Sequence, residues 1–135
     1  MQVSSAFHQV LYISQLAPGR EYDTFTAVCR VARRRNGELG ACGVLLFDGH
    51  RFCQLLQGPA DSVQALMRDI AEDPRHERVA VLVDMPAEAA NIERHWWAGF
   101  CEAHELDLLD TELGVRGEVA MATFRDIVSR ADLSP

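Results

Sequence analysis

Three polar residues, Tyr12, Asn36 and Gln54, are candidates for chemistry because of where they lie in the sequence. Gln54 sits in the apolar run Phe-Cys-Gln-Leu-Leu, where a buried amide must find partners for both its donor and its acceptor end. Each residue also has an ordinary explanation. A glutamine at a sheet edge bonds to backbone or water, a strand tyrosine packs with its hydroxyl in water, and an asparagine before a glycine ends a helix. The residues gain meaning only as a set.

Composition argues against several other kinds of site. The formal net charge is −7 and the pI is near 5.1, so we expect no nucleic-acid partner, and the three arginines at 33–35 need a local explanation. The four cysteines lack CxxC spacing and the five histidines lack i, i+4 pairs, so we expect reduced thiols and no metal. No apolar stretch approaches the ~18 residues of a membrane span, and no leader pattern is present. We therefore expect a cytoplasmic protein.

The first half of the chain predicts a strand, a helix and a hairpin. Alternation at residues 10–14 places Tyr12 and Ser14 on one face of a strand. Residues 22–35 have helical periodicity, with Asp23 as a candidate cap and Gly37 just beyond the end. Two extended runs follow, at residues 43–47 and 51–56, and they flank an Asp-Gly turn that is typical of a hairpin. A Gly-Pro pair at 58–59 should stop the second run.

The second half continues the pattern into an α+β fold. Residues 63–71 predict a helix that Asp61 can cap and that an Asp-Pro pair at 73–74 ends. The continuous apolar run at 79–83 predicts a strand inside the sheet. The resulting β-α-β-β-α-β order is ferredoxin-like, with both helices on one face.

Beyond this unit we expect a polar connection at residues 87–95 and a fifth strand at residues 96–101. A terminal helix should follow at residues 118–130. At 135 residues the chain has the size of one compact domain. We therefore divide it into a core domain, residues 1–103, and a C-terminal helical extension, residues 104–135, that packs on the same domain.

An ordered set of motifs resembles the BLUF family, sensors of blue light using flavin. The motifs are Leu-Tyr-Ile-Ser at 11–14, Arg-Asn-Gly-Glu-Leu-Gly-Ala-Cys-Gly-Val-Leu-Leu-Phe-Asp-Gly at 35–49, Arg-Phe-Cys-Gln-Leu-Leu-Gln-Gly-Pro at 51–59, Asp-Pro-Arg-His at 73–76 and Trp-Trp-Ala-Gly-Phe at 96–100. Asn36 follows Tyr12 by 24 residues and precedes Gln54 by 18. No single motif is specific, but their order and spacing are.

The resemblance implies a non-covalently bound flavin, FAD or alternatively FMN. By this resemblance Tyr12 is the photoactive tyrosine, Gln54 lies between its phenol and the flavin, and Asn36 fixes the carbonyl edge of the ring. Ser14 corresponds to a neighbour of the ring edge.

Further residues complete the expected flavin site. Arg35 and Arg75 correspond to positions that contact the ribityl or phosphate part, which gives the basic cluster a local use. A flat ring with apolar faces suits a slot between two helices, and Val28 and Ile70 are our candidates for its two faces. Each of these two residues is also an ordinary core residue if considered alone.

The family pattern differs from this chain near the expected output. Trp96 corresponds to the tryptophan of a Trp-Ser-Met-Gly-Phe type motif, but Ala98 replaces the methionine. Cys42 stands where threonine is common and Gln57 where glutamate is common. Without the bulky competitor at 98, we expect Trp96 to keep one position in dark and light.

The resemblance implies a sensor that turns over no substrate and is not an enzyme. Light would drive electron and proton transfer from Tyr12 to the flavin and the return of both. Gln54 would be left rotated or tautomerised, with a stronger bond to a flavin carbonyl and a red-shifted absorption. The last strand and terminal helix would pass the change to a partner protein or a homo-oligomer.

Two other functions compete with this interpretation. An acylphosphatase-like hydrolase shares the element order and would use Arg20 in the loop at 15–20, but that loop lacks the glycines that let backbone amides converge on phosphate. A ferredoxin-like interaction module without cofactor is the second alternative. A flavin spectrum from the purified protein would exclude both.

Overall fold

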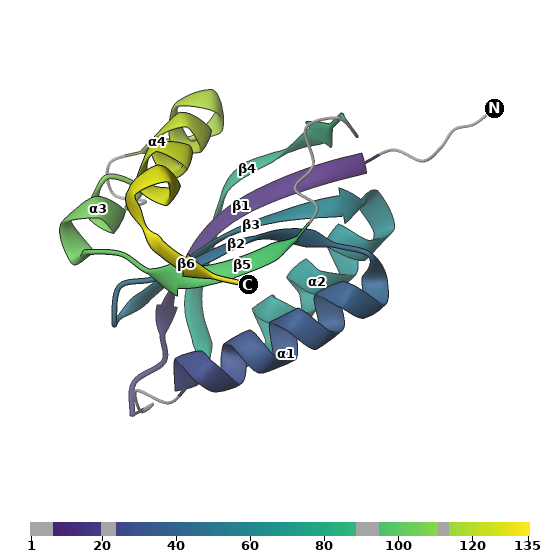
Figure 1. Ribbon diagram of the computed structural model, residues 1–135, viewed down its shortest axis with the longest axis horizontal. Coiled ribbons are helices and arrows are strands. Elements are labelled where there is room, and N and C mark those ends of the chain that lie inside the picture. Colours follow the sequence, from purple (N-terminus) through teal and green to yellow (C-terminus); the bar gives the residue numbers. More distant parts are fainter. Residues whose placement is uncertain (1–6, 20–23, 89–94, 111–113) are drawn as a thin grey trace.

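A twisted sheet forms the centre of the molecule (Figure 1). The structure is a computed structural model that describes residues 7–19, 24–88, 95–110 and 114–135. In this part of the chain the sheet has six strands in the order β4-β1-β3-β2-β5-β6. They are β1 (Phe7–Leu16), β2 (Cys42–Phe47), β3 (Arg51–Pro59), β4 (His76–Ala87), β5 (Trp96–Phe100) and β6 (Asp132–Ser134).

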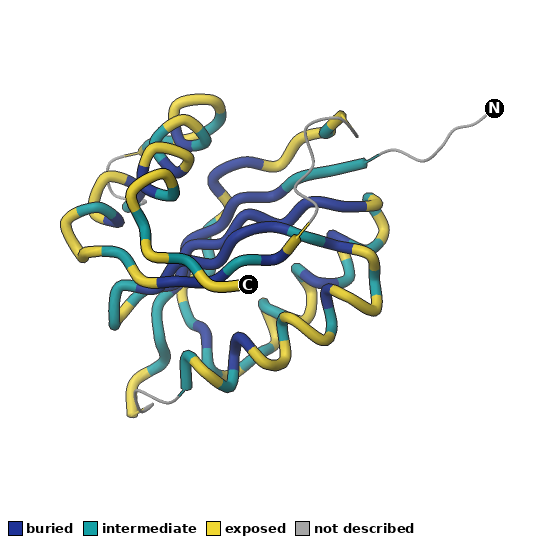
Figure 2. Tube along the Cα trace, in the orientation of Figure 1, coloured by how far each residue is buried: buried dark blue, intermediate teal, exposed yellow. Residues whose placement is uncertain are grey.

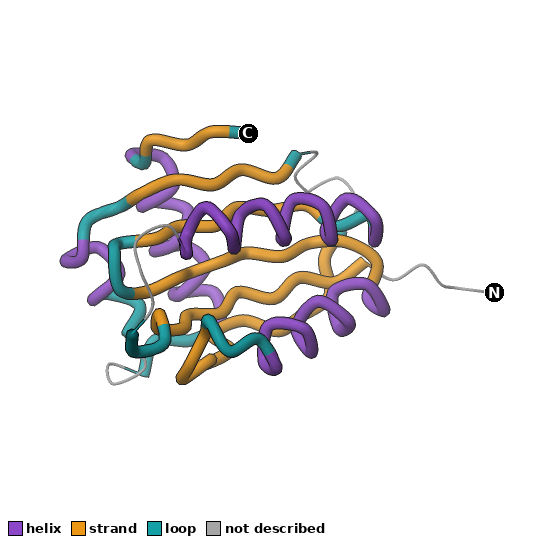
Figure 3. Tube along the Cα trace, turned by 90° about the horizontal axis from the view of Figure 1, so that it is seen from below, coloured by secondary structure: helices purple, strands orange, loops and turns teal. Residues whose placement is uncertain are grey.

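Helices cover both faces of this sheet. α1 (Thr24–Leu39) and α2 (Ala60–Glu72) lie side by side on one face, as Figures 1 and 3 show. α3 (Ala103–Asp107) and α4 (Gly117–Arg130) lie on the other. β3 pairs antiparallel with both β1 and β2, so β1 and β2 run parallel with β3 between them. This is the split β-α-β arrangement, and the predicted α+β, ferredoxin-like order with both helices on one face is confirmed.

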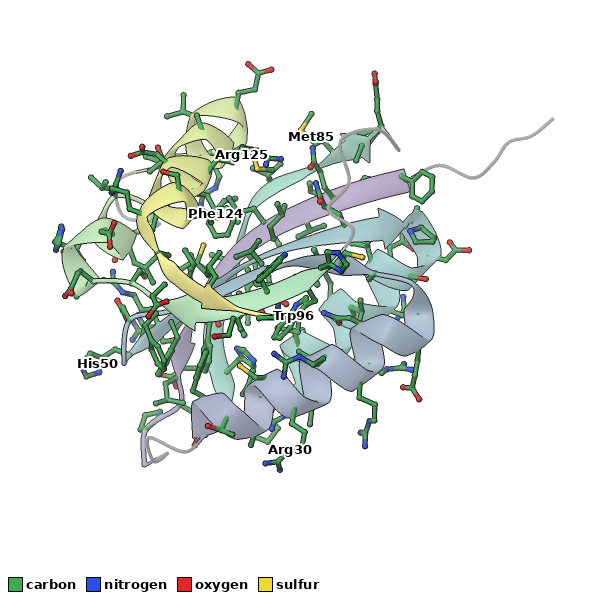
Figure 4. All side chains as sticks on the ribbon, viewed as in Figure 1. Arg30, His50, Met85, Trp96, Phe124 and Arg125 are labelled. Atoms are coloured by element: carbon green, nitrogen blue, oxygen red, sulfur yellow. The ribbon has the colours of Figure 1, made fainter. Side chains whose placement is uncertain are left out.

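Alternation along the strands divides the core into two layers. Leu11 and Ile13 of β1 face α4, where Phe124 points toward the sheet (Figure 4). Val10 and Tyr12 face the opposite side and pack with residues of α2. Figure 2 shows the central strands as the most continuously buried part of the described chain. The predicted sharing of one face by Tyr12 and Ser14 follows from this alternation.

α1 is longer than the sequence predicts, and the prediction that Gly37 lies just past its end is wrong. Asn36 and Gly37 lie inside the helix, which ends only at Leu39. Gly40, with φ of 71°, provides the left-handed residue at the helix end, and the Ala41 N–H donates to the Asn36 carbonyl at 2.8 Å. One glycine in a helix costs only about 1 kcal/mol, so the helix continues to the second glycine. The predicted cap Asp23 lies outside the described residues.

The prediction that the Gly-Pro pair stops the second hairpin strand is confirmed, whereas the predicted cap of the second helix is wrong. β3 includes this pair and ends at Pro59. α2 therefore begins at Ala60 with Pro59 as its N-cap, and Asp61 lies in the first turn without capping the helix. A carboxylate there still complements the helix dipole. The predicted end at Asp73 is confirmed.

β4 is an edge strand, so the prediction that residues 79–83 lie inside the sheet is wrong. Only Leu82 and Val83 of that run are buried, and Val81 is 41% exposed. A continuous apolar run is typical of interior strands, but among the described residues no strand pairs with the outer edge of β4. The fifth strand and the terminal helix are found close to their predicted bounds, whereas α3 and β6 were not predicted. None of the helices in the described ranges combines the length and hydropathy needed to cross a lipid bilayer.

The two glycines at 43 and 37 should respond oppositely to alanine. Gly43 has φ of 147°, and a Cβ there would lie 1.8 Å from the Leu55 carbonyl oxygen. Gly43→Ala should lower the free energy of unfolding by more than about 2 kcal/mol. At Gly37 a Cβ meets nothing within 4 Å, so Gly37→Ala should raise it by about 0.5–1 kcal/mol. Urea unfolding measures both, and equal effects would contradict the backbone described here.

Candidate functional site

Sheet register brings Tyr12 and Gln54 together. The two residues are direct partners across the β1–β3 ladder, and both are buried, at 0% and 3% exposure. Gln54 Nε2 donates to the Tyr12 hydroxyl at 2.6 Å. The buried amide of Gln54 thus uses its donor end on the phenol.

The acceptor end of Gln54 is used by Trp96, the first residue of β5. The Trp96 indole N–H donates to Gln54 Oε1 at 3.0 Å. Asn36 accepts a hydrogen bond from the same indole N–H, at 2.9 Å from Trp96 Nε1. In this orientation of the Asn36 amide both ends have partners, because its NH₂ group donates to the Ala32 carbonyl at 3.2 Å. The three predicted amide and hydroxyl residues therefore converge, joined by Trp96. Ala98 lies buried in the same apolar cluster as Trp96.

A cavity between α1 and α2 opens onto this network. Its volume is about 60 Å³, and most of the residues predicted to hold flavin line it: Tyr12, Val28, Arg35, Asn36, Gln54, Ile70 and Arg75. Val28 and Ile70 come from the two different helices, as a ring bound between them requires. The donor set suits a flat ring with a polar edge. Typical ligand pockets measure about 300–1,000 Å³, so a ring of this kind needs more room than the cavity has here.

Both predicted arginines carry an acidic partner at this cavity. Arg35 Nε lies 3.0 Å from Asp69 Oδ2, a half-exposed pair of the kind that contributes only ~0–1 kcal/mol. Arg75 donates to both oxygens of Asp73 through Nε and Nη2. Hydrogen bonds to Asp73 raise the pKa of Arg75, and although burial acts to raise the pKa of Asp73, its bonds to Arg75 lower it overall. The sequence predicted no role at the cavity for either aspartate, although Asp73 belongs to the motif at 73–76.

Ser14 does not line the cavity, but it bonds to a residue that does. Ser14 Oγ lies 2.8 Å from His76 Nδ1, and both residues are buried. In the β1–β4 ladder His76 pairs with Leu16, two residues beyond Ser14 on β1. Burial lowers the pKa of His76 to about 4, so the ring is neutral at pH 7. In the sequence His76 belongs to a motif without a predicted role of its own, and only the folded structure shows its contact with Ser14.

Burial also sets the protonation state of Tyr12. It raises the pKa of the phenol well above its ordinary value, although the hydrogen bond from Gln54 acts in the opposite direction. The hydroxyl therefore stays protonated at any physiological pH. Gln54 donates to this hydroxyl, so the phenol proton itself is not part of that hydrogen bond.

Fold and site together define a small ligand-binding α+β domain with a buried tyrosine–glutamine pair at its cavity. The family model described as "Sensors of blue-light using FAD" matches residues 7–97, and the chain belongs to this BLUF family. It is thus a blue-light flavin sensor domain.

Individual relatives agree with this assignment. The blue light- and temperature-regulated antirepressor BluF of Escherichia coli (strain K12) is 30% identical over 125 residues, which is 93% of this chain and 29% of that protein. The photoactivated adenylate cyclase subunit beta of Euglena longa is 33% identical over 92 residues, 68% of this chain and 11% of that protein. This chain therefore spans less than a third of these relatives.

Among solved structures, the dark state of BlrB, a BLUF protein, has the same fold. Its TM-score is 0.75 at 24% identity, covering 95% of this chain and 98% of that one. The family assignment removes the hydrolase alternative. The loop proposed for that activity lines a cavity in which Arg51 is paired with both Asp48 and Asp110, and Arg20 lies outside the described residues.

The neutral state of His76 should make stability depend on pH. Its pKa is about 4 when folded and 6.5 when exposed, so below pH 6.5 the unfolded chain binds the proton first. The free energy of unfolding should therefore fall by roughly 2–3 kcal/mol between pH 6.5 and 4 through this residue. His76→Gln should lose that part of the pH dependence in urea unfolding, whereas His50→Gln, at an exposed histidine, should retain it. Parallel pH profiles for wild type and His76→Gln would refute the assignment.

Proposed function

We propose that Tyr12 and Gln54 form the light-driven switch of this sensor. The observation that carries the proposal is the buried chain Tyr12–Gln54–Trp96, in which one amide end serves a phenol and the other an indole. A bound flavin supplies a blue-light-excited oxidant. Tyr12 would give up an electron and its hydroxyl proton. The Gln54 NH₂ group that faces the hydroxyl cannot accept a proton, so the turned amide would take it on its carbonyl oxygen, and both the electron and the proton would then return to Tyr12. Gln54 is left rotated or tautomerised, with a changed set of hydrogen bonds.

The flavin in this proposal is FAD, in accord with the family description. Asn36 and Gln54 hold the polar edge of the ring, and Val28 and Ile70 cover its faces. Arg35 and Arg75 exchange their aspartate partners for the ribityl and phosphate groups, an exchange that the weak, half-exposed Arg35–Asp69 pair favours. FMN would offer the same ring with fewer phosphates, so it remains the alternative cofactor.

We further propose that residues 1–103 sense light and that residues 104–135 belong to the output. The relatives fused to cyclase subunits suggest that the signal reaches another protein or a homo-oligomer. All four cysteines lie in the described ranges and none of them forms a disulfide, which suits the reducing cytoplasm. Trp96 keeps its place in both states in this proposal, because Asn36 still accepts its N–H when Gln54 turns.

Removing the switch residues should abolish photochemistry without unfolding the protein. Tyr12→Phe keeps the ring volume but removes the proton and electron donor, so blue light should give no red shift and flavin fluorescence should rise. Gln54→Leu should lose the red shift because nothing can rearrange. The measurement is a light-minus-dark absorption spectrum at equal flavin occupancy.

Gln57→Leu provides the matched control. Gln57 is a buried amide on the same strand, bonded to Gln9 Oε1 at 3.0 Å rather than to Tyr12. It should keep a normal red shift. A normal red shift in Tyr12→Phe or Gln54→Leu would mean that this pair is not the switch.

Asn36 should govern flavin retention more than photochemistry. Asn36→Ala leaves one bond to the ring edge unmade, which costs about 1–3 kcal/mol and weakens binding about 5- to 150-fold. Equilibrium titration with FAD, followed by fluorescence, measures the change. Glu38→Ala, on the exposed side of the same helix, should bind like the wild type. Equal affinities for all three proteins would exclude Asn36 from the site.

A further inference from the structure

Arg33 on α1 contacts the tryptophan of this network from outside the cavity. Its guanidinium carbon lies 5.1 Å from the centre of the Trp96 ring, within cation–π distance. The same guanidinium donates through Nη2 to the main-chain oxygen of Pro135 at 2.7 Å. A planar guanidinium can stack on a ring and donate at its rim at the same time, which an ammonium group cannot do as well.

Pro135, which accepts the hydrogen bond from Arg33, directly follows β6, the short outer strand of the sheet. β6 pairs with β5 alone, from Ala98 with Ser134 to Phe100 with Asp132. Its position depends on Gly99, because a Cβ there would lie 2.1 Å from the Asp132 carbonyl oxygen. Three residues of ladder hold weakly, and the bond from Arg33 to Pro135 adds to this pairing and to the packing of Leu133 on the core.

A turned Gln54 would change what Trp96 experiences. In the structure Gln54 presents its carbonyl to the indole N–H. Turning the amide by half a rotation places its NH₂ group there, and two donors then face each other. Trp96 retains Asn36 as acceptor but loses Gln54, and the ring is held less firmly while it stays in place.

We propose that Arg33 is a positioning residue that couples the state of Gln54 to the docking of β6. It holds the Trp96 ring against Gln54, which penalises the turned amide and hastens the return to the dark state. In the lit state the loosened ring weakens the hold of Arg33, and β6 detaches more often from β5. This inference rests on the proposed Tyr12–Gln54 switch and names how its state reaches the C-terminal segment.

The first test is the dark recovery of the red-shifted state after a blue flash. Arg33→Gln should slow recovery about fivefold, the size expected from one lost cation–π contact, because Trp96 can then yield to the turned amide. Arg33→Lys, which keeps the charge, should lie between this variant and the wild type. Arg30 lies one turn earlier on α1, and its side chain points away from the sheet (Figure 4). The control variant Arg30→Gln should therefore recover at the wild-type rate.

The second test is hydrogen exchange of the β5–β6 amides in residues 96–100 and 132–134. Illumination should speed exchange in the wild type, whereas Arg33→Gln should exchange fast in the dark and change little with light. Because coupling is reciprocal, Gly99→Ala, which displaces β6, should also slow dark recovery, and the double variant should be no slower than the slower single variant.

The outcomes separate this inference from the switch itself. A wild-type protein with bound flavin but no red shift contradicts the Tyr12–Gln54 switch and with it the coupling. A normal red shift with wild-type recovery in Arg33→Gln contradicts the coupling alone. Light-independent exchange of β6 in the wild type also contradicts it. Should Gly99→Ala fail to fold, the recovery rate of Arg33→Gln alone decides.

Discussion

The orientation of one buried amide is the constraint on which the site depends. Gln54 lies between Tyr12, whose hydroxyl both donates and accepts, and Trp96, whose indole N–H only donates. Trp96 therefore fixes the carbonyl end of Gln54 on its own side and leaves the NH₂ end for the phenol. A tyrosine or water in place of Trp96 would accept either orientation. With Trp96 present, the two orientations differ in energy, which a switch with one resting state requires.

The fold serves to hold these three groups at hydrogen-bonding distance. The β1–β3 register makes Tyr12 and Gln54 direct partners, and the β2–β5 pairing brings the first residue of β5 to the same face. α1 lies over that face, so the Asn36 amide oxygen can accept the hydrogen bond from the Trp96 indole. Burial then removes water that would otherwise compete for every bond, and it keeps Tyr12 protonated and His76 neutral. A one-residue slip of β1 would turn Tyr12 to the opposite core.

Much of this arrangement follows from the sequence because local patterns and global fold agree. Alternation placed Tyr12 on its face, the Asp-Gly turn set the hairpin, and motif spacing predicted that Tyr12, Asn36 and Gln54 meet. What could not be predicted depends on long-range geometry. The edge position of β4 depends on which strand pairs beside β1, and the Ser14–His76 contact joins residues 62 positions apart. The Arg33–Pro135 bond joins residues about a hundred positions apart, and β6 is too short to leave a periodic signal.

The most direct test of the central claim is the infrared difference spectrum of the wild-type protein with bound flavin, recorded before and after blue light. If Gln54 changes its hydrogen bonds as proposed, a ring carbonyl of the flavin gains a stronger bond, so its stretching frequency should fall on illumination and return in the dark. Isotopic labelling of glutamine should shift bands in the same spectrum. A red-shifted absorption with unchanged flavin carbonyl and glutamine bands would contradict the account.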